Sequence, residues 1–140
     1  ICEKRPFNNS KELADLISSL RLKVRRKHHP ATLTFQALRM EVNDEVEELK
    51  QVLSDSFSLL GVGGRLAVIS YHSTEDKVVK SFINKGLKSC ECPPLNFECI
   101  CNIEPILKLV NKKPITPTEE EIYQNSRSRS AKLRVIERIK

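Results

Sequence analysis

The residues best suited to chemistry follow a short apolar run in the middle of the chain. Residues 65–70 form this run after a Gly-Gly turn, a pattern typical of a parallel strand buried on both faces of a sheet. His72 and Ser73 come almost directly after it, and ligands of doubly wound sheets bind beyond the carboxyl ends of the strands. We therefore predict that His72 and Ser73 are the catalytic residues lining a substrate pocket. The alternative is that Ser73, with Asp76, only caps a helix and that His72 only packs.

Two acidic residues and one helical segment supply further candidate substrate contacts. Glu75 and Asp76 could orient the preceding side chains, or they could only favour a helix N-terminus through its dipole. In the segment 32–60, polar residues three and four apart share a helical face that can point into the active cleft or toward RNA, or can hydrogen-bond neighbouring loops. The candidates from this segment are Thr34, Gln36, Arg39 and Asn43, of which the last three have that spacing.

Basic residues favour a polyanionic partner. The formal net charge is +6, and lysine and arginine side chains near phosphates release condensed counterions. One basic cluster lies within residues 21–27. A second cluster near the end of the chain contains arginines suited to bidentate phosphate contact, although ordinary solvated surface is the alternative for both clusters. Its candidate RNA contacts are Arg127, Arg129, Ser130 and Arg134.

Four cysteines form a C-x-C…C-x-C pattern that could bind zinc through four thiolates. The spacing is tighter than in the common C-x-x-C knuckle, so we favour reduced thiols in a loop and predict no metal. Disulfides are not expected, because nothing indicates secretion. Neither a metal nor free thiols would make this loop catalytic. The four residues are Cys90, Cys92, Cys99 and Cys101.

The elements that must position these residues follow from hydrophobic spacing and cap signals. A helix is predicted over residues 10–20, one long helix over 32–60 that ends at a glycine-rich turn, and another helix over 75–84. Strands are predicted at 106–110 and 132–139, with a small helix beginning near Thr118. The fold class is therefore α/β. No apolar run is long enough to cross a membrane and no signal peptide opens the chain, so a cytoplasmic location is expected.

Four segments resemble, in order, the motifs of one enzyme family. Residues 29–43 read HPATLTFQALRMEVN, residues 63–76 read GGRLAVISYHSTED, and residues 113–121 read KPITPTEEE. The fourth, residues 125–134, reads NSRSRSAKLR. Together they resemble the bacterial 16S ribosomal RNA small-subunit methyltransferase H family. One departure affects a possible phosphate contact, because Leu33 stands where that family usually has arginine or lysine.

The resemblance implies a function and a domain layout. That family transfers a methyl group from S-adenosylmethionine to the exocyclic N4 of a cytidine in the decoding region of small-subunit ribosomal RNA. Its fold is a class I (Rossmann-like) sheet with an inserted helical domain. By resemblance, residues 1–30 are the end of the helical insert and a basic connector. Residues 31–140 are then the C-terminal part of the α/β domain, with a cysteine-containing loop at 86–106. The implied partner is ribosomal RNA, without a membrane.

The resemblance also implies that the S-adenosylmethionine-binding residues lie outside this chain. In that family the glycine-rich cofactor loop precedes the inserted helices, whereas Gly61–Gly64 here precedes a strand. This arrangement indicates a helix-ending turn rather than a cofactor cradle. We therefore expect the chain alone to be inactive. The alternative is a non-catalytic basic fragment that binds RNA or regulates.

Overall fold

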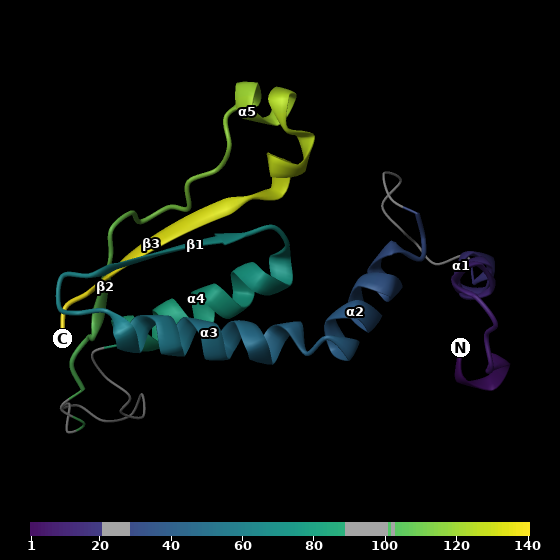
Figure 1. Cartoon of the computed structure of the whole chain (residues 1–140), viewed down its shortest axis with the longest axis horizontal. Coiled ribbons are helices and arrows are strands. Elements are labelled where there is room, and N and C mark those ends of the chain that lie inside the picture. Colours follow the sequence, from purple (N-terminus) through teal and green to yellow (C-terminus); the bar gives the residue numbers. More distant parts are fainter. Residues whose placement is uncertain (21–28, 89–100, 102) are drawn as a thin grey trace, which may run out of the picture. The chain divides into compact units, whose positions relative to one another are not determined.

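The computed structural model describes residues 1–20, 29–88, 101 and 103–140, which fall into two compact units, Ile1–Glu45 and Val46–Lys140 (Figure 1). The first unit contains a short 3₁₀ helix, η1 (Cys2–Lys4), and the helices α1 (Ser10–Ser19) and α2 (Thr32–Val42). The predicted helix at 10–20 is confirmed. Asn9 caps it, because its side-chain oxygen accepts a hydrogen bond from the Glu12 amide at 3.0 Å.

The single long helix predicted over 32–60 is wrong, because the chain forms two helices there. After α2 ends, α3 (Glu45–Leu59) begins, and Asp44 between them has a left-handed φ of 51°. Aspartate tolerates this conformation better than most residues, since its short polar side chain can hydrogen-bond locally. The apolar spacing continues across the break, so the spacing alone could not reveal it. The division between the two compact units falls at the same place.

The second unit combines α3 and two further helices with a small sheet (Figure 1). Three strands have the order β1-β3-β2, and both β1 and β2 run antiparallel to β3. The strands predicted at 106–110 and 132–139 are confirmed. The prediction that residues 65–70 pair as a parallel strand is wrong for the described residues. The remaining elements are β1 (Arg65–Ser70), α4 (Ser73–Leu87), β2 (Leu107–Leu109), α5 (Glu119–Gln124), η2 (Ser126–Ser130) and β3 (Lys132–Arg138).

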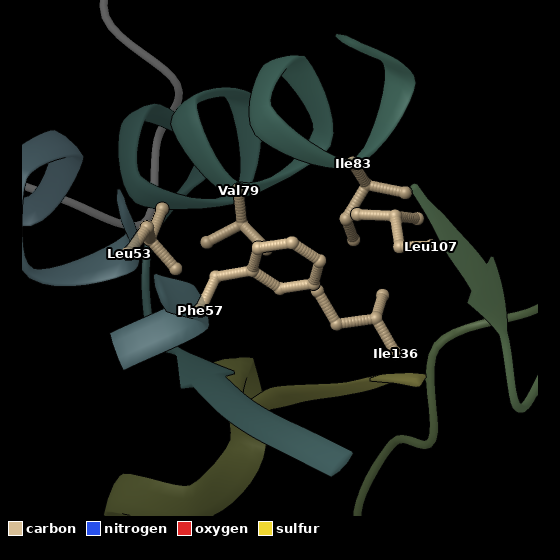
Figure 2. Close-up of a cluster of buried hydrophobic side chains, with 6 residues drawn as sticks. All are labelled: Leu53, Phe57, Val79, Ile83, Leu107 and Ile136. Atoms are coloured by element: carbon tan, nitrogen blue, oxygen red, sulfur yellow. The ribbon is translucent and has the colours of Figure 1, made fainter. Parts of the chain in front are cut away.

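The core of this unit lies between α3, α4 and one face of the sheet. Six buried side chains from four elements meet there (Figure 2), and the rings of Phe57 and Phe82 pack edge to face at 5.8 Å. Along β1, Leu66 and Val68 pack against this core while Ile69 is exposed. Burial on both faces is therefore also a wrong prediction for β1. The six core residues are Leu53, Phe57, Val79, Ile83, Leu107 and Ile136.

The glycine-rich turn joins α3 to β1 and is held by the far end of β3. The amide of Gly63 donates to the carbonyl of Arg138 at 2.7 Å, and the amide of Arg138 donates to the carbonyl of Gly64 at 2.9 Å. Gly63 has a φ of 83°, which glycine adopts without the steric cost of a side chain. The turn thus ends a helix and starts a strand, as the sequence predicts. In the described part of the chain, no helix is long and apolar enough to cross a membrane.

Candidate functional site

Most predicted site residues of the second unit gather where β1 ends. The register pairs Ser70, the last residue of β1, with Lys132, the first residue of β3. The start of α4 follows β1 after two residues, and η2 leads into β3 after one (Figure 1). We call this region, residues 70–76 and 126–134, the polar edge. In this region the polar side chains that follow β1 lie near the arginines that precede β3 and the one within it.

His72 occupies the N-cap of α4 and closes its first turn. Its Nδ1 accepts a hydrogen bond from the Glu75 amide at 3.3 Å. The Glu75 carboxylate in return accepts from the amides of Tyr71 at 2.7 Å and His72 at 3.2 Å. This reciprocal capping box satisfies amides that a helix start leaves open. The predicted cap by Ser73 and Asp76 is therefore wrong, because Ser73 is already the first helical residue.

The second ring nitrogen of His72 is buried and has no hydrogen-bond partner among the described residues. Nε2 lies 2.9 Å from Oε1 of Glu75, but the pair does not meet hydrogen-bond geometry, so we treat it as a close electrostatic approach. Since Nδ1 acts as an acceptor, a neutral ring carries its proton on Nε2. The side chain is 19% exposed. Because Nε2 is buried, Nε2–H is a donor that reaches an acceptor only after a reorientation of the ring or of its neighbours.

Asp76 and Arg134 form a buried ion pair that sequence reasoning missed. Asp76 is 3% exposed, and its Oδ1 lies 2.9 Å from Nε of Arg134. Lys80 and Lys132 approach the other carboxylate oxygen at 3.0 and 3.5 Å. Burial raises the pKa of Asp76, but hydrogen bonds and charge from these cations outweigh it and lower the pKa to about 2. The carboxylate is therefore ionised, and direct contact of either partner with RNA stays a prediction.

The arginines of η2 are placed differently from Arg134. Arg127 and Arg129 are exposed, and within the described part of the chain neither guanidinium has an ion-pair partner. Between them Ser128 is buried and donates to the carbonyl of Asn125 at 2.8 Å, which fixes the turn. Ser130 is also exposed at the end of η2. This segment presents two exposed positive charges within the polar edge.

One exposed aromatic residue near η2 was not predicted as a site residue. Tyr123, on α5, is 91% exposed. Aromatic faces stack on unpaired bases of single-stranded nucleic acid, so its position before the arginine-containing turn is suited to such a contact. The sequence around Tyr123 has no regular apolar spacing, so it could not predict that this side chain is almost fully exposed.

The candidates on α2 and at its C-cap, Asn43, lie in the first unit. Arg39 pairs with Glu45 at 2.8 Å, and the side-chain amide of Asn43 donates to the same carboxylate at 3.3 Å. Thr34 and Gln36 are half-buried. In the structure, Arg39 and Asn43 therefore make local contacts with Glu45, as the alternative of structural hydrogen bonding predicts. Their contact with RNA stays a prediction.

The structure gives no support for a metal site within its described residues. Cys90, Cys92 and Cys99 lie outside them, and Cys101 is half-buried. In the described ranges no three histidine, cysteine, aspartate or glutamate side chains are grouped to hold a metal. The four-thiolate hypothesis therefore depends on three residues that the structure does not describe.

Comparisons with known proteins agree along nearly the whole chain. The sequence model of the MraW methylase family matches residues 1–139. Ribosomal RNA small subunit methyltransferase H of Dehalococcoides mccartyi is 52% identical over 139 residues, covering 99% of this chain and 40% of that protein. The proteins of the same name from Finegoldia magna and Helicobacter pylori are 44% and 49% identical, covering 98% and 96% of this chain.

The chain spans less than half the length of these relatives, 45% of the Finegoldia protein and 42% of the Helicobacter protein. The residues that match the family model include all those of the polar edge, 70–76 and 126–134. With a family match over residues 1–139 and about half of its residues identical to a curated relative, the chain belongs to the MraW methylase family.

Proposed function

We propose that this chain supplies the substrate-facing part of an S-adenosylmethionine-dependent methyltransferase that modifies N4 of a cytidine in the decoding region of small-subunit ribosomal RNA. Family membership and the names of the relatives support methylation of ribosomal RNA. The observation that carries the proposal is the polar edge, where a buried donor on His72 lies in the same region as the exposed arginines of η2. The His72 donor is suited to hydrogen-bond a base, and the arginines are suited to contact the phosphates of the RNA backbone.

Methylation of an exocyclic amine depends chiefly on positioning. The target cytosine must leave its stack, and its polar edge must be held so that the amine faces the methyl group. Nε2–H of His72 is suited to donate to an acceptor on that edge, and the exposed hydroxyl of Ser73 lies next to it in the first turn of α4. Glu75 keeps the imidazole oriented, because its carboxylate caps the helix from which the ring projects.

The glycine-rich turn does not fit S-adenosylmethionine as a cofactor cradle. A cradle needs open backbone amides at a loop that leads from a strand into a helix. The glycine-rich turn runs from α3 into β1, and the Gly63 amide already donates to Arg138. We therefore place the cofactor-binding residues outside this chain and assign its own residues to the base and the RNA backbone.

The test separates the cap function of His72 from its proposed contact with the base. In the full-length protein, His72→Asn keeps an efficient N-cap acceptor but lacks a nitrogen at the place of Nε2, whereas His72→Ala loses both. We expect both variants to methylate ribosomal RNA about 10²-fold more slowly, the usual loss for one positioned donor. The measurement is methyl incorporation at the target cytidine, with folding checked by circular dichroism. Unchanged methylation by a folded His72→Asn protein would remove His72 from the site.

A further inference from the structure

The outward face of α4 carries a continuous ridge of basic side chains. Four lysines occur between residues 77 and 88, and that segment contains no acidic residue. These lysines and the polar side chains between them surround a depression of about 520 Å³ on the helix surface. We call this surface the α4 ridge, and it consists of Lys77, Lys80, Ser81, Asn84, Lys85 and Lys88. We propose that the α4 ridge binds the phosphate backbone of RNA, as a contact additional to the polar edge.

Helical spacing explains why these side chains share one face. At 3.6 residues per turn, positions three, four, seven and eight apart lie within one stripe of a helix surface. The opposite stripe holds Val79 and Ile83, which are buried in the core (Figure 2). Burial of that stripe forces the lysines outward, and the Lys80 side chain is 51% exposed even though it reaches Asp76. The ridge is therefore fixed by the same packing that fixes the core.

Within the described residues, the ridge has more positive charge than the acidic side chains paired with it can neutralise. Lys77 and Lys85 have no acidic partner among residues 29–88 and 103–140. Lys80 pairs with Asp76, but that single carboxylate also faces Arg134 and Lys132. One negative charge among three positive charges leaves a surplus of two. A field of one sign along a helix attracts a polyanion and raises its local concentration.

The chemistry of the ridge favours a nucleic-acid backbone over an acidic peptide. Ser81 and Asn84 fill the spaces between lysines, so the ridge offers hydrogen-bond donors but no apolar anchor. An acidic amphipathic peptide needs such an anchor, which only the adjoining apolar groove of about 860 Å³ offers. That groove shares Lys77, Lys85 and Lys88 with the ridge and contains Glu104, whereas Lys80 and Asn84 of the ridge lie outside it. Phosphates need only charge and donors, which the ridge supplies.

Position adds a second reason, which rests on the proposed function. α4 starts at the polar edge with His72 as its N-cap, and its lysines continue along the same helix. From Lys77 to Lys85 the helix axis advances about 12 Å. An RNA strand whose base enters the polar edge can therefore continue along α4, with successive phosphates beside the ridge.

The test measures the salt dependence of RNA binding, which counts phosphate contacts. The full chain is titrated into a fluorescently labelled small-subunit ribosomal RNA fragment containing the decoding region, at several salt concentrations. The variant Lys77→Gln/Lys85→Gln is compared with Lys4→Gln/Lys11→Gln, which removes equal charge from exposed lysines outside the ridge. We expect the ridge variant to bind more weakly and its slope of log affinity against log salt to be shallower by about 1.4, at about 0.7 for each lost contact with single strands. The control slope should not change.

Three results would overturn the inference. Equal slopes for the ridge variant and the unaltered chain would show that the ridge does not contact RNA, while leaving the proposed methylation standing. If the ridge variant no longer binds a polyglutamate peptide that the unaltered chain binds, while its RNA binding is retained, the ridge would be assigned to an acidic protein instead. No RNA binding by the unaltered chain would overturn both the ridge and the RNA part of the proposed function. Methyl incorporation by the full-length ridge variant is a separate readout, expected to fall through weaker RNA binding rather than a slower maximal rate.

Discussion

His72 performs a structural task with one ring nitrogen and leaves the other without a hydrogen bond among the described residues. Its placement was predictable, because a glycine turn, a short apolar strand and a helix start are local signals that fix where a side chain projects. Its capping was not, since serine is the usual cap and the sequence offers Ser73 one position later. The structure shows that the cap and the proposed base contact belong to one residue. This is why an asparagine at position 72 separates them.

The Asp76–Arg134 pair shows what sequence reasoning at the residue level cannot reach. The two residues are 58 positions apart, and they meet only because β3 lies beside β1 in one register. A shift of one residue in that register would send Arg134 to the opposite face of the sheet. Both were identified as candidates, but as substrate contacts rather than as partners. The information that joins them is tertiary.

Replacing Asp76 by asparagine should destabilise the fold and change its response to acid. The folded pKa of about 2 lies below the ordinary 3.8, so the carboxylate stabilises the fold above about pH 4. That contribution, about 2 kcal/mol, is lost as the pH falls toward 2. Urea unfolding followed by circular dichroism should show Asp76→Asn less stable by about this amount at pH 7, with the difference shrinking between pH 4 and pH 2.

Asp55→Asn is the matched control, because Asp55 is exposed on α3. It should change the unfolding free energy by less than about 0.5 kcal/mol at any pH. A constant difference between Asp76→Asn and the unaltered chain at all pH values would contradict the assignment of the acid dependence to this carboxylate.

At the scale of whole elements, sequence patterns fixed the identity of helices and strands better than their pairing. The strands at 106–110 and 132–139 and the small helix after Thr118 are confirmed. Among the described residues the predicted parallel pairing of residues 65–70 is wrong, because a short apolar run specifies a strand but not its neighbour. The helix break at Asp44 was missed for a similar reason: the apolar spacing continues through it.

Close packing between α4 and β2 provides a test at this scale. A methyl group added at Gly86 would lie 2.4 Å from Cδ2 and 2.7 Å from Cγ of Leu107, which is 1% exposed. Gly86→Ala should gain up to about 1 kcal/mol in helix propensity. Overpacking costs about 1–3 kcal/mol, so we expect a net loss of stability. Urea unfolding measures it, and Gly61→Ala, with no atom within 4 Å of the added methyl, is the control.

Greater stability of Gly86→Ala than of Gly61→Ala would show that β2 yields easily and that α4 is not held against it. The backbone contact between these elements argues otherwise, because the Ile106 amide donates to the Gly86 carbonyl at 3.0 Å. The side chain of Leu107 and the main chain just before β2 therefore both lie close to α4. A glycine at this position permits that approach.

For the molecule as a whole, the question is which chemistry these 140 residues perform by themselves. The sheet has three described strands, and β1 forms one side of it, with β3 as its strand partner in the described residues. An open strand edge accepts a further strand, which agrees with a chain that spans about 40% of a close relative. The arginines of η2 and the lysines of the α4 ridge, by contrast, all lie within the chain. We therefore expect this chain alone to bind RNA but not S-adenosylmethionine.

Calorimetry with S-adenosylmethionine tests this expectation. We expect the chain to give no measurable heat of binding at cofactor concentrations that saturate the full-length protein, because Gly61–Gly64 is occupied in joining α3 to β1. The same preparation should bind ribosomal RNA with a steep salt dependence. Stoichiometric binding of the cofactor by these residues alone would contradict our placement of the cofactor site. If the full-length protein also fails to bind the cofactor while the chain binds RNA, the non-catalytic RNA-binding function is the correct one, and His72 then serves only as the cap of α4.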